Sequence, residues 1–224
     1  MAVPNRVGGI VDAALEVFGR LGYSRAQMAD VAEAAGVSVG TLYNYVEGKE
    51  ALLLLCALYA FDPDEATRGP KPLTVASRPR FLAQLRQALD DITQLPALDA
   101  ALARQGPPAH FVEECTRIVE ELFDLIGDHR RGLDALERSA RDMPDVAALF
   151  YDNVRRGLLR DLTTYVARRA PQLDAAVTAR WIVESITWMA RHRFGDPDGG
   201  RLDAEAVRAT TVELITRAIS GGTA

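Results

Sequence analysis

The chain has 224 residues, of which 48% are hydrophobic and 25% charged, and 26 Lys and Arg against 31 Asp and Glu give a net charge of −5. This composition is typical of a folded globular protein and excludes a disordered chain. The longest apolar run, Ala51 to Phe61, is too short to cross a bilayer, the N-terminus lacks a signal-peptide pattern, and two cysteines make no disulfide framework. We therefore expect a cytoplasmic protein with no membrane partner.

The first 61 residues carry the apolar periodicity of four short helices. From Ile10 to Leu21, apolar residues recur at the spacing of one helix face, and the predicted helix ends before Gly22. Further helices are predicted over residues 28–35, 38–46 and 48–61. No stretch alternates with the period of a strand, so we expect an all-α fold.

Residues 62–77 contain prolines and glycine without periodicity, which predicts a linker. Beyond it, periodicity and breaks at proline and glycine predict helices over residues 77–92, 110–126, 134–141, 145–169, 175–194 and 204–220. Ser77 is the expected N-cap of the first of these. We therefore expect a helix-turn-helix domain over residues 1–47, a connecting helix over 48–61, the linker, and a larger helical domain over 78–224.

The segment from Gln27 to Val46 has the pattern of a helix-turn-helix. Gly36 suits a left-handed turn between its two helices, and Ser38 is the expected N-cap of the second helix. Leu42 and Val46 lie one turn apart and face inward. The outward residues would enter a DNA major groove, and they are Val39, Gly40, Thr41, Tyr43 and Asn44. The alternative is a helical hairpin with only a structural role.

At these residues the chain resembles the DNA-binding domain of the TetR (tetracycline-repressor-type) family of transcriptional regulators. The resemblance covers residues 7–62, and its motifs include Leu21-Gly22-Tyr23, Val31 to Ser38, Gly40-Thr41-Leu42-Tyr43 and Lys49-Glu50-Ala51-Leu52. It implies a homodimeric repressor, not an enzyme, that binds a palindromic double-stranded DNA operator and is released by a small-molecule effector. The candidate DNA-binding residues are Arg25, Gln27, Ser38, Val39, Gly40, Thr41, Tyr43, Asn44, Tyr45 and Lys49.

The chain departs from the family pattern at several positions in and near the motif. Ala26 stands where the family usually has a threonine or serine, and Ser24 with Gln27 could supply a capping box instead. Val39 stands at a position that is often basic. Residues 26–48 contain no lysine or arginine, which leaves Arg6, Arg25 and Lys49 as the cations near the motif.

The C-terminal helices carry the aromatic residues among which the resemblance implies an effector pocket. Our candidates for its lining are Phe111, Cys115, Phe123 and Phe150, and the expected effector is apolar. We expect no cofactor and no metal. His110 and Glu114 have the spacing of two metal ligands on a helix, but the sequence indicates no third ligand, which favours a surface or pocket-edge pair.

The last two helices each have one wide apolar face, and the resemblance implies that such helices form the dimer as a four-helix bundle. The candidate interface residues are Trp181, Trp188, Val207, Thr211, Leu214, Ile215 and Ala218. The core of a single subunit could instead absorb either face. Two other functions remain open at this point. One is a ligand-sensing or scaffolding protein of the same fold without DNA binding, and the other is a helical enzyme.

Overall fold

The computed structural model describes residues 6–221, and this part of the chain contains helices and no strand; an isolated bridge joins Val46 and Leu73. The all-α prediction is confirmed. The N-terminal helices are α1 (Arg6–Leu21), α2 (Met28–Ala34), α3 (Val39–Tyr43), α4 (Lys49–Phe61), α5 (Pro63–Arg68) and α6 (Arg78–Ile92).

The remaining helices occupy the rest of the described chain. They are α7 (Pro96–Ala103), α8 (Phe111–Asp128), α9 (Arg130–Ala140), α10 (Pro144–Ala148), a π-helical segment (Leu149–Arg155), α11 (Arg156–Arg169), α12 (Ala175–Ala190) and α13 (Ala204–Ser220). Short 3-10 turns lie between the last two helices, at His192–Gly195 and Gly199–Arg201. Within residues 6–221, none of these helices combines the length and the apolar character that crossing a membrane requires.

The start of α6 agrees with the capping residue predicted from the sequence. Ser77 accepts a hydrogen bond from the Arg80 N–H at 3.4 Å, and Pro79 lies in the first turn of α6, where a missing N–H costs nothing. Asp174 and Asp203, which the sequence analysis did not identify, cap α12 and α13 in the same way. The Ser77 cap is a local interaction, which is why the sequence predicts it.

Three elements differ from the prediction. Residues 63–68 of the expected linker form α5, because Asp62 caps its first turn and Pro63 takes the N1 position. The helix α7 was not predicted, and it begins at Pro96. The single helix expected over 145–169 is α10, a π-helical segment and α11, because the wider turn adds a residue between two α-helical stretches.

The contacts divide the chain into two compact units. Unit 1 comprises Met1–Thr93 and Arg131–Val154, and unit 2 comprises Gln94–Arg130 and Arg155–Ala224. This division by packing differs from the functional segments expected from the sequence, since α6 and residues 131–154 pack with the helix-turn-helix. The functional boundaries themselves stay a prediction.

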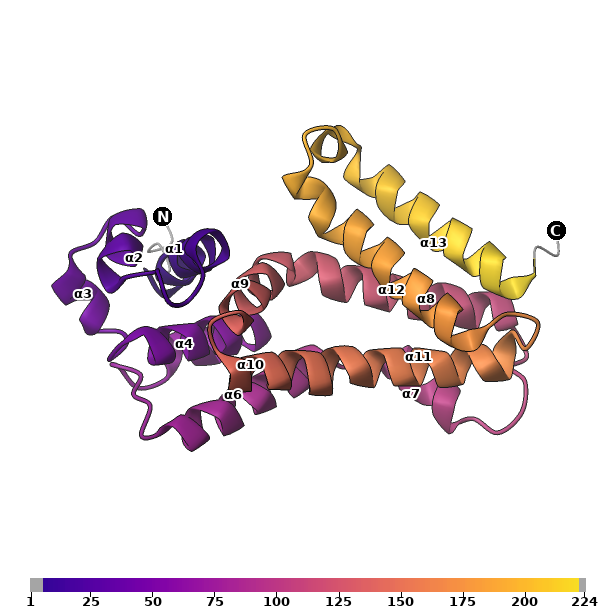
Figure 1. Cartoon of the computed structure of the whole chain (residues 1–224), viewed down its shortest axis with the longest axis horizontal. Coiled ribbons are helices and arrows are strands. Elements are labelled where there is room, and N and C mark those ends of the chain that lie inside the picture. The colour runs from indigo at the N-terminus through magenta and orange to yellow at the C-terminus, as the bar shows by residue number, and fades with distance from the viewer. Residues whose placement is uncertain (1–5, 222–224) are drawn as a thin grey trace. The chain divides into compact units, whose positions relative to one another are not determined.

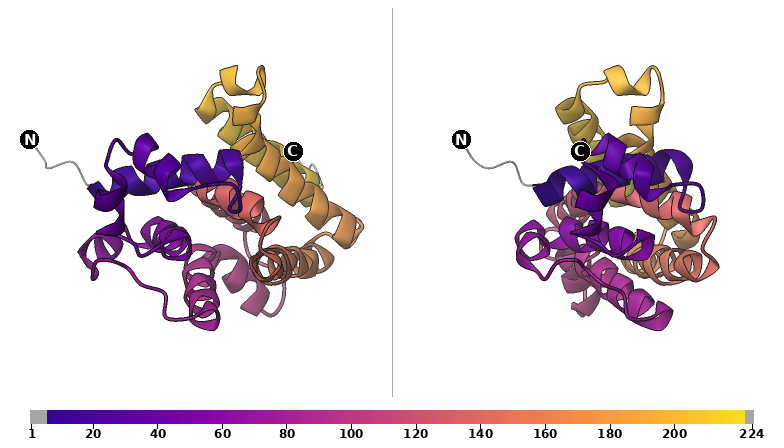
Figure 2. Two further views of the ribbon diagram at one scale, coloured as in Figure 1. Left: turned by 60° about the vertical axis from the view of Figure 1, so that its left-hand side comes forward. Right: turned by 90° about the vertical axis from the view of Figure 1, so that its left-hand side faces the viewer.

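Unit 1 is built around α1 and α4. The helix α1 packs on α2 and α4, and α4 packs on α6, so that α1 to α4 cluster together in every view (Figures 1 and 2). Val17, Phe18 and Leu52 are fully buried at the centre. This core supports the short helices α2 and α3, which are too short to be stable alone.

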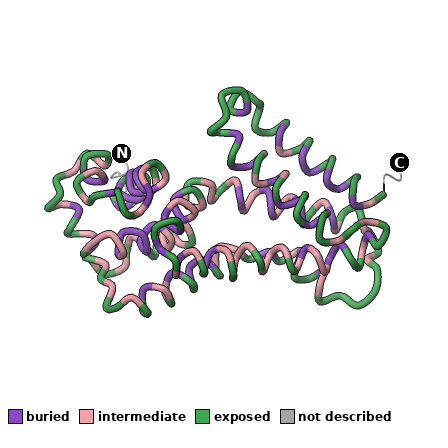
Figure 3. The backbone as a smooth tube through the Cα atoms, in the orientation of Figure 1, coloured by how far each residue is buried: buried purple, intermediate pink, exposed green. Residues whose placement is uncertain are grey.

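Unit 2 is built from α7, α8, α11, α12 and α13. The helix α13 packs on α8 and α12, α11 packs on α12, and α7 packs on α8 and α11. Buried and exposed positions alternate along α12 and α13, so each of these helices turns one face inward and leaves the other exposed (Figure 3). The exposed faces of α12 and α13 are therefore available for a partner.

Candidate functional site

The turn between α2 and α3 has the geometry predicted for a helix-turn-helix. Gly36 has a φ of 65°, a left-handed conformation that favours glycine. Ser38 Oγ accepts a hydrogen bond from the Thr41 N–H at 3.0 Å and lies 2.8 Å from the Thr41 hydroxyl, so Ser38 is the N-cap of α3, as predicted. Leu42 and Val46 are fully buried and anchor α3 against unit 1.

The candidate DNA-binding residues lie mainly on the exposed side of this anchor. Val39 is 40% exposed and Tyr43 is 45% exposed. Thr41, Tyr45 and Lys49 are half-buried. The remaining candidates are exposed, and they are Arg25, Gln27, Ser38, Gly40 and Asn44. The structure thus brings the set together around α3 and the starts of α2 and α4. Their contacts with DNA stay a prediction.

The two cations of this set are held by backbone carbonyls of their own unit. Arg25 Nε donates to the Leu21 carbonyl at 3.0 Å, and Lys49 Nζ donates to the Tyr23 carbonyl at 2.8 Å. Lys49 also lies 4.6 Å from the centre of the Tyr23 ring. Burial, aided by the nearby Glu50 carboxylate, raises the pKa of Tyr23 to about 12, so this phenol stays neutral. Lys49 is therefore fixed at the N-terminus of α4.

The capping box expected at Ser24 and Gln27 is wrong. The N-cap of α2 is Gln27, and its N–H donates to Asp30 Oδ2 at 2.8 Å. The Ser24 N–H instead donates to Asp142 Oδ2 at 2.9 Å. The sequence could not show this bond, because its two residues lie 118 positions apart.

Further long-range contacts hold the helix-turn-helix within unit 1. Arg131 pairs with Asp12 at 2.6 Å. Arg78 donates to Asp145 Oδ2 at 2.8 Å and also pairs with Glu50, and its hydrogen bonds lower the pKa of the Asp145 carboxyl. These ion pairs connect α1 and α4 to the region around α9 and α10. The sequence analysis did not identify any of them.

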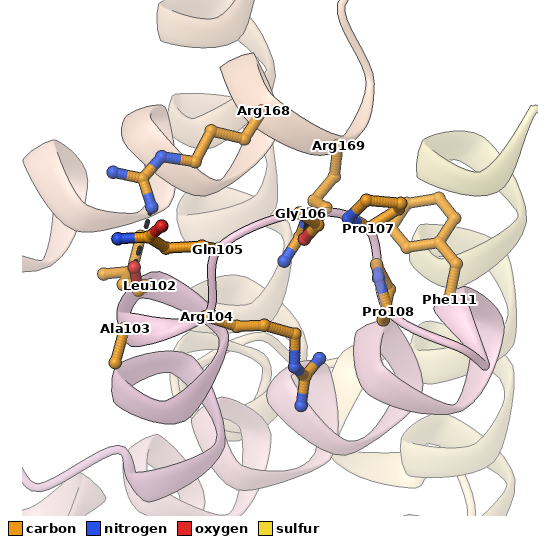
Figure 4. Close-up of a pocket in the computed structure, with 10 residues that line it drawn as sticks. All are labelled: Leu102, Ala103, Arg104, Gln105, Gly106, Pro107, Pro108, Phe111, Arg168 and Arg169. Carbon is orange, nitrogen blue, oxygen red and sulfur yellow. Dashed lines mark hydrogen bonds between the residues drawn. The ribbon is translucent and has the colours of Figure 1, made fainter.

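Unit 2 contains a cavity of about 670 Å³, within the size range of small-molecule sites. Its wall comprises the end of α7, the loop before α8, the start of α8 and the end of α11 (Figure 4). Three arginines line it, and of the described lining residues none is acidic. The lining residues are Leu102, Ala103, Arg104, Gln105, Gly106, Pro107, Pro108, Phe111, Arg168 and Arg169.

The four candidate pocket residues do not come together at this cavity. Phe111 lines it, whereas Cys115 and Phe123 are buried further along α8. Phe150 lies in the core of unit 1, where its ring packs edge-on against Tyr151 with 5.0 Å between the ring centres. Burial raises the pKa of the Cys115 thiol to about 11, so this cysteine is a neutral side chain at physiological pH. A role for these four residues in an effector pocket stays a prediction.

The candidate interface residues divide into two groups. Trp181, Trp188 and Leu214 are 46%, 41% and 59% exposed. Ala218 is also exposed. The other three are buried within the chain itself, with 1% to 8% of their surface exposed, and they are Val207, Thr211 and Ile215. The amphipathic pattern of α13 could not separate these groups, because it shows one wide apolar face and not its division between the subunit core and a partner.

His110 and Glu114 do not form a metal site in the described part of the chain, where no three potential ligands cluster. Glu114 instead forms ion pairs with Arg104 and, at 3.2 Å, with Arg169. The Glu114 side chain is 9% exposed and the Arg169 side chain is 7% exposed, so this ion pair is buried. Removing both charges from water is costly, and the pair is stable only because its geometry is good.

Comparison with known proteins identifies the family to which this fold belongs. Residues 10–56 match the family model described as bacterial regulatory proteins, tetR family. The HTH-type transcriptional repressor KstR of Rhodococcus jostii is 31% identical over 180 residues, which cover 78% of this chain and 79% of that protein. The fatty acid metabolism regulator protein of Bacillus subtilis is 44% identical over 45 residues, which cover 20% of this chain and 23% of that protein.

Solved structures show the same fold along nearly the whole chain. AibR, solved with isovaleryl coenzyme A and operator DNA, has a TM-score of 0.55 at 17% identity, covering 93% of this chain and 97% of that one. FadR from Bacillus subtilis, solved with stearoyl-CoA, has a TM-score of 0.50 at 17% identity and the same coverage. The extensive match to KstR, with a helix-turn-helix of the predicted geometry, establishes that this chain belongs to the tetR family of bacterial regulatory proteins and is a DNA-binding transcriptional regulator.

Proposed function

We propose that this regulator is a homodimeric repressor that binds a palindromic operator through α3 and is released from it by a coenzyme A thioester. The observation that carries the DNA-binding part is the exposed side of α3, with Val39, Gly40 and Tyr43, on the buried anchor of Leu42 and Val46. A helix presented in this way fits the major groove. Such a protein acts where the chromosome is, which supports a cytoplasmic location.

The contacts proposed for α3 are mostly uncharged. Thr41 and Asn44 would contact base edges, since a threonine methyl group fits thymine and an asparagine amide pairs with adenine. Tyr43 would donate its hydroxyl to a phosphate, which positions the protein without reading sequence. The N–H groups at the starts of α2 and α4 would assist the few cations.

The proposed dimer uses the exposed faces of α12 and α13. Trp181, Trp188, Leu214 and Ala218 would pack against their counterparts about a two-fold axis. Val207, Thr211 and Ile215 support this face from inside the subunit. Two α3 helices related by such an axis would meet successive major grooves, about 34–36 Å apart.

A coenzyme A thioester fits the cavity better than a wholly apolar effector does. The apolar effector expected from the aromatic residues accounts for an acyl chain, but not for three arginines around one cavity. AibR and FadR are of this fold and were solved with such thioesters. Release then follows from differential affinity, because the ligand shifts the population only if it binds the DNA-free arrangement more tightly.

A selection of binding sites from randomised DNA tests the proposal, with the affinity of the selected site measured by fluorescence anisotropy. We expect one palindromic consensus, bound by the wild type and weakened at least tenfold when isovaleryl-CoA or stearoyl-CoA is added. Free isovalerate and stearate are the matched controls. If no sequence is enriched even at low salt, the proposed binding of a palindromic operator through α3 is wrong.

A further inference from the structure

We infer that the arginine-lined cavity of unit 2 binds the phosphate end of the coenzyme A thioester, with Arg168 and Arg104 contacting the phosphates and Phe111 beside the adenine. The inference rests on the proposed function, because it locates one part of the proposed effector. Its starting point is the charge of the lining, which contains three guanidinium groups and, among its described residues, no carboxylate.

Backbone carbonyls and one carboxylate hold the arginines of the cavity. Arg168 donates to the Leu102 carbonyl at 2.7 Å, a bond drawn in Figure 4, and Arg169 donates to the Gly106 carbonyl at 2.6 Å. Glu114 pairs with both Arg104 and Arg169 from behind the lining. A single buried carboxylate therefore orients two guanidiniums and leaves the group with a net positive charge, which favours a ligand with several phosphates.

Backbone geometry adds to the positive character. Phe111 is the first residue of α8, an 18-residue helix, and the side chain of its N-cap, His110, makes no capping hydrogen bond. The first N–H groups of a helix are free to bind an anion, and the helix dipole favours it. Gly106 has a φ of 92°, and a Cβ built on it would meet nothing within 4 Å, so the loop is open at this point.

An apolar wall stands beside the arginines. Phe111, Pro107 and Pro108 all line the cavity (Figure 4). A flat aromatic base can pack on such a surface. The phosphates of coenzyme A are attached to an adenosine, so the cavity offers a partner for each chemical part of that end of the molecule.

Calorimetric titration of the full-length protein tests the site directly, without DNA. The probes are coenzyme A, isovaleryl-CoA and isovaleryl-pantetheine, which keeps the thioester and lacks the phosphates and adenosine. We expect Arg168→Gln to weaken binding of both coenzyme A compounds at least tenfold, and Arg104→Gln with Arg168→Gln to weaken it at least a hundredfold. Binding of isovaleryl-pantetheine should stay within twofold of the wild type.

Arg160→Gln is the matched control, because Arg160 is an exposed arginine of the same helix α11 that pairs with its neighbour Asp161. It should leave every affinity within twofold. Equal binding of isovaleryl-CoA by wild type and Arg168→Gln would overturn the assignment, and so would failure of the wild type to bind any coenzyme A compound. Inorganic phosphate or pyrophosphate binding as tightly as coenzyme A would show a general anion site and overturn it too.

The operator affinity of the same proteins separates the two proposals. DNA binding by the wild type and by Arg168→Gln should be equal when no ligand is present. If both bind the operator and isovaleryl-CoA releases both at the same concentration, the repressor function holds and the arginine site is wrong. If neither selects a DNA sequence while coenzyme A binding depends on Arg168, the site holds and the repressor function is wrong.

Discussion

The two units distribute their cations in opposite ways. In unit 1, residues 26–48 contain no lysine or arginine. In unit 2, three arginines surround one cavity. Unit 1, which we propose binds DNA, thus has fewer cations at its proposed binding surface than unit 2 has around its cavity. The net charge of −5 therefore does not indicate which surface binds an anionic ligand, because binding depends on where the charges lie.

The units also differ in what they leave exposed. Unit 1 exposes a small mixed surface at α3, which suits the edges of bases and the sugar-phosphate backbone. Unit 2 exposes tryptophans and leucine on α12 and α13, which suits a second copy of the chain. DNA binding by unit 1 then depends on unit 2, because pairing two weakly basic recognition surfaces raises the affinity by an effective-concentration effect.

The largest effect should come from the exposed face of unit 2. We expect Leu214→Asp to give a folded monomer whose operator affinity is lower by about 100-fold or more, since avidity is lost. Sedimentation and circular dichroism measure the two properties. Its neighbour provides the contrast, because Ile215 is 1% exposed and Ile215→Asp should cost more than about 4 kcal/mol of folding free energy. A Leu214→Asp protein that stays dimeric would refute the proposed interface.

The next effect concerns the uncharged contacts of α3. Tyr43→Ala should weaken binding to all DNA sequences by about tenfold, or about 1.4 kcal/mol, because a phosphate contact is lost. Tyr43→Phe separates the hydroxyl from the ring. Thr41→Ala and Asn44→Ala should instead change the selected consensus. The selection is repeated with each variant, and an unchanged consensus and affinity for Thr41→Ala and Asn44→Ala would place the recognition surface elsewhere.

The salt dependence of the affinity for DNA tests whether few cations of unit 1 contact phosphates. If only Arg6, Arg25 and Lys49 of each subunit neutralise phosphates, the plot of log affinity against log salt should have a slope no steeper than about −5. Arg25→Ala should make the slope shallower by about 2 in the dimer, one unit per subunit. Anisotropy titrations at several salt concentrations give the slope. A slope near −10 would mean that other cations contact the DNA.

The smallest predicted effect concerns the reactivity of the two cysteines, Cys56 in unit 1 and Cys115 in unit 2. Burial raises the pKa of Cys56 to about 12 and that of Cys115 to about 11, from ordinary values near 9.0. Neither thiol should react with an alkylating agent at pH 8 in the folded protein. Because the unfolded chain releases these protons first, their contribution to stability should fall as the pH rises from about 9 towards 11.

Labelling of Cys56→Ser and Cys115→Ser at increasing urea compares the units, since each variant retains the thiol of the other unit. Reaction of either thiol in the absence of urea, at a rate like that of a free thiol, would contradict the burial of that cysteine. Different urea midpoints would show that unit 1 and unit 2 unfold separately.

The sequence by itself determined the local features of this protein. The helical periods, the turn at Gly36 and the caps at Ser38 and Ser77 each depend on residues a few positions apart, so the helix-turn-helix could be predicted with its exposed residues. The family pattern lies in the same short stretch. The missed helix α7 and the π-helical segment show the limit even of local reasoning, since packing against distant helices stabilises such short elements.

Only the tertiary structure decided what depends on residues far apart in the chain. It placed Leu214 outside and Ile215 inside, because α8 and α12 cover one part of the apolar face of α13. It brought the end of α11 to the loop before α8, so that Arg168 and Arg169 line one cavity together with Arg104. Periodicity reports how polar each side of a helix is, whereas the packing of the other helices determines which side meets the core, a ligand or a second subunit.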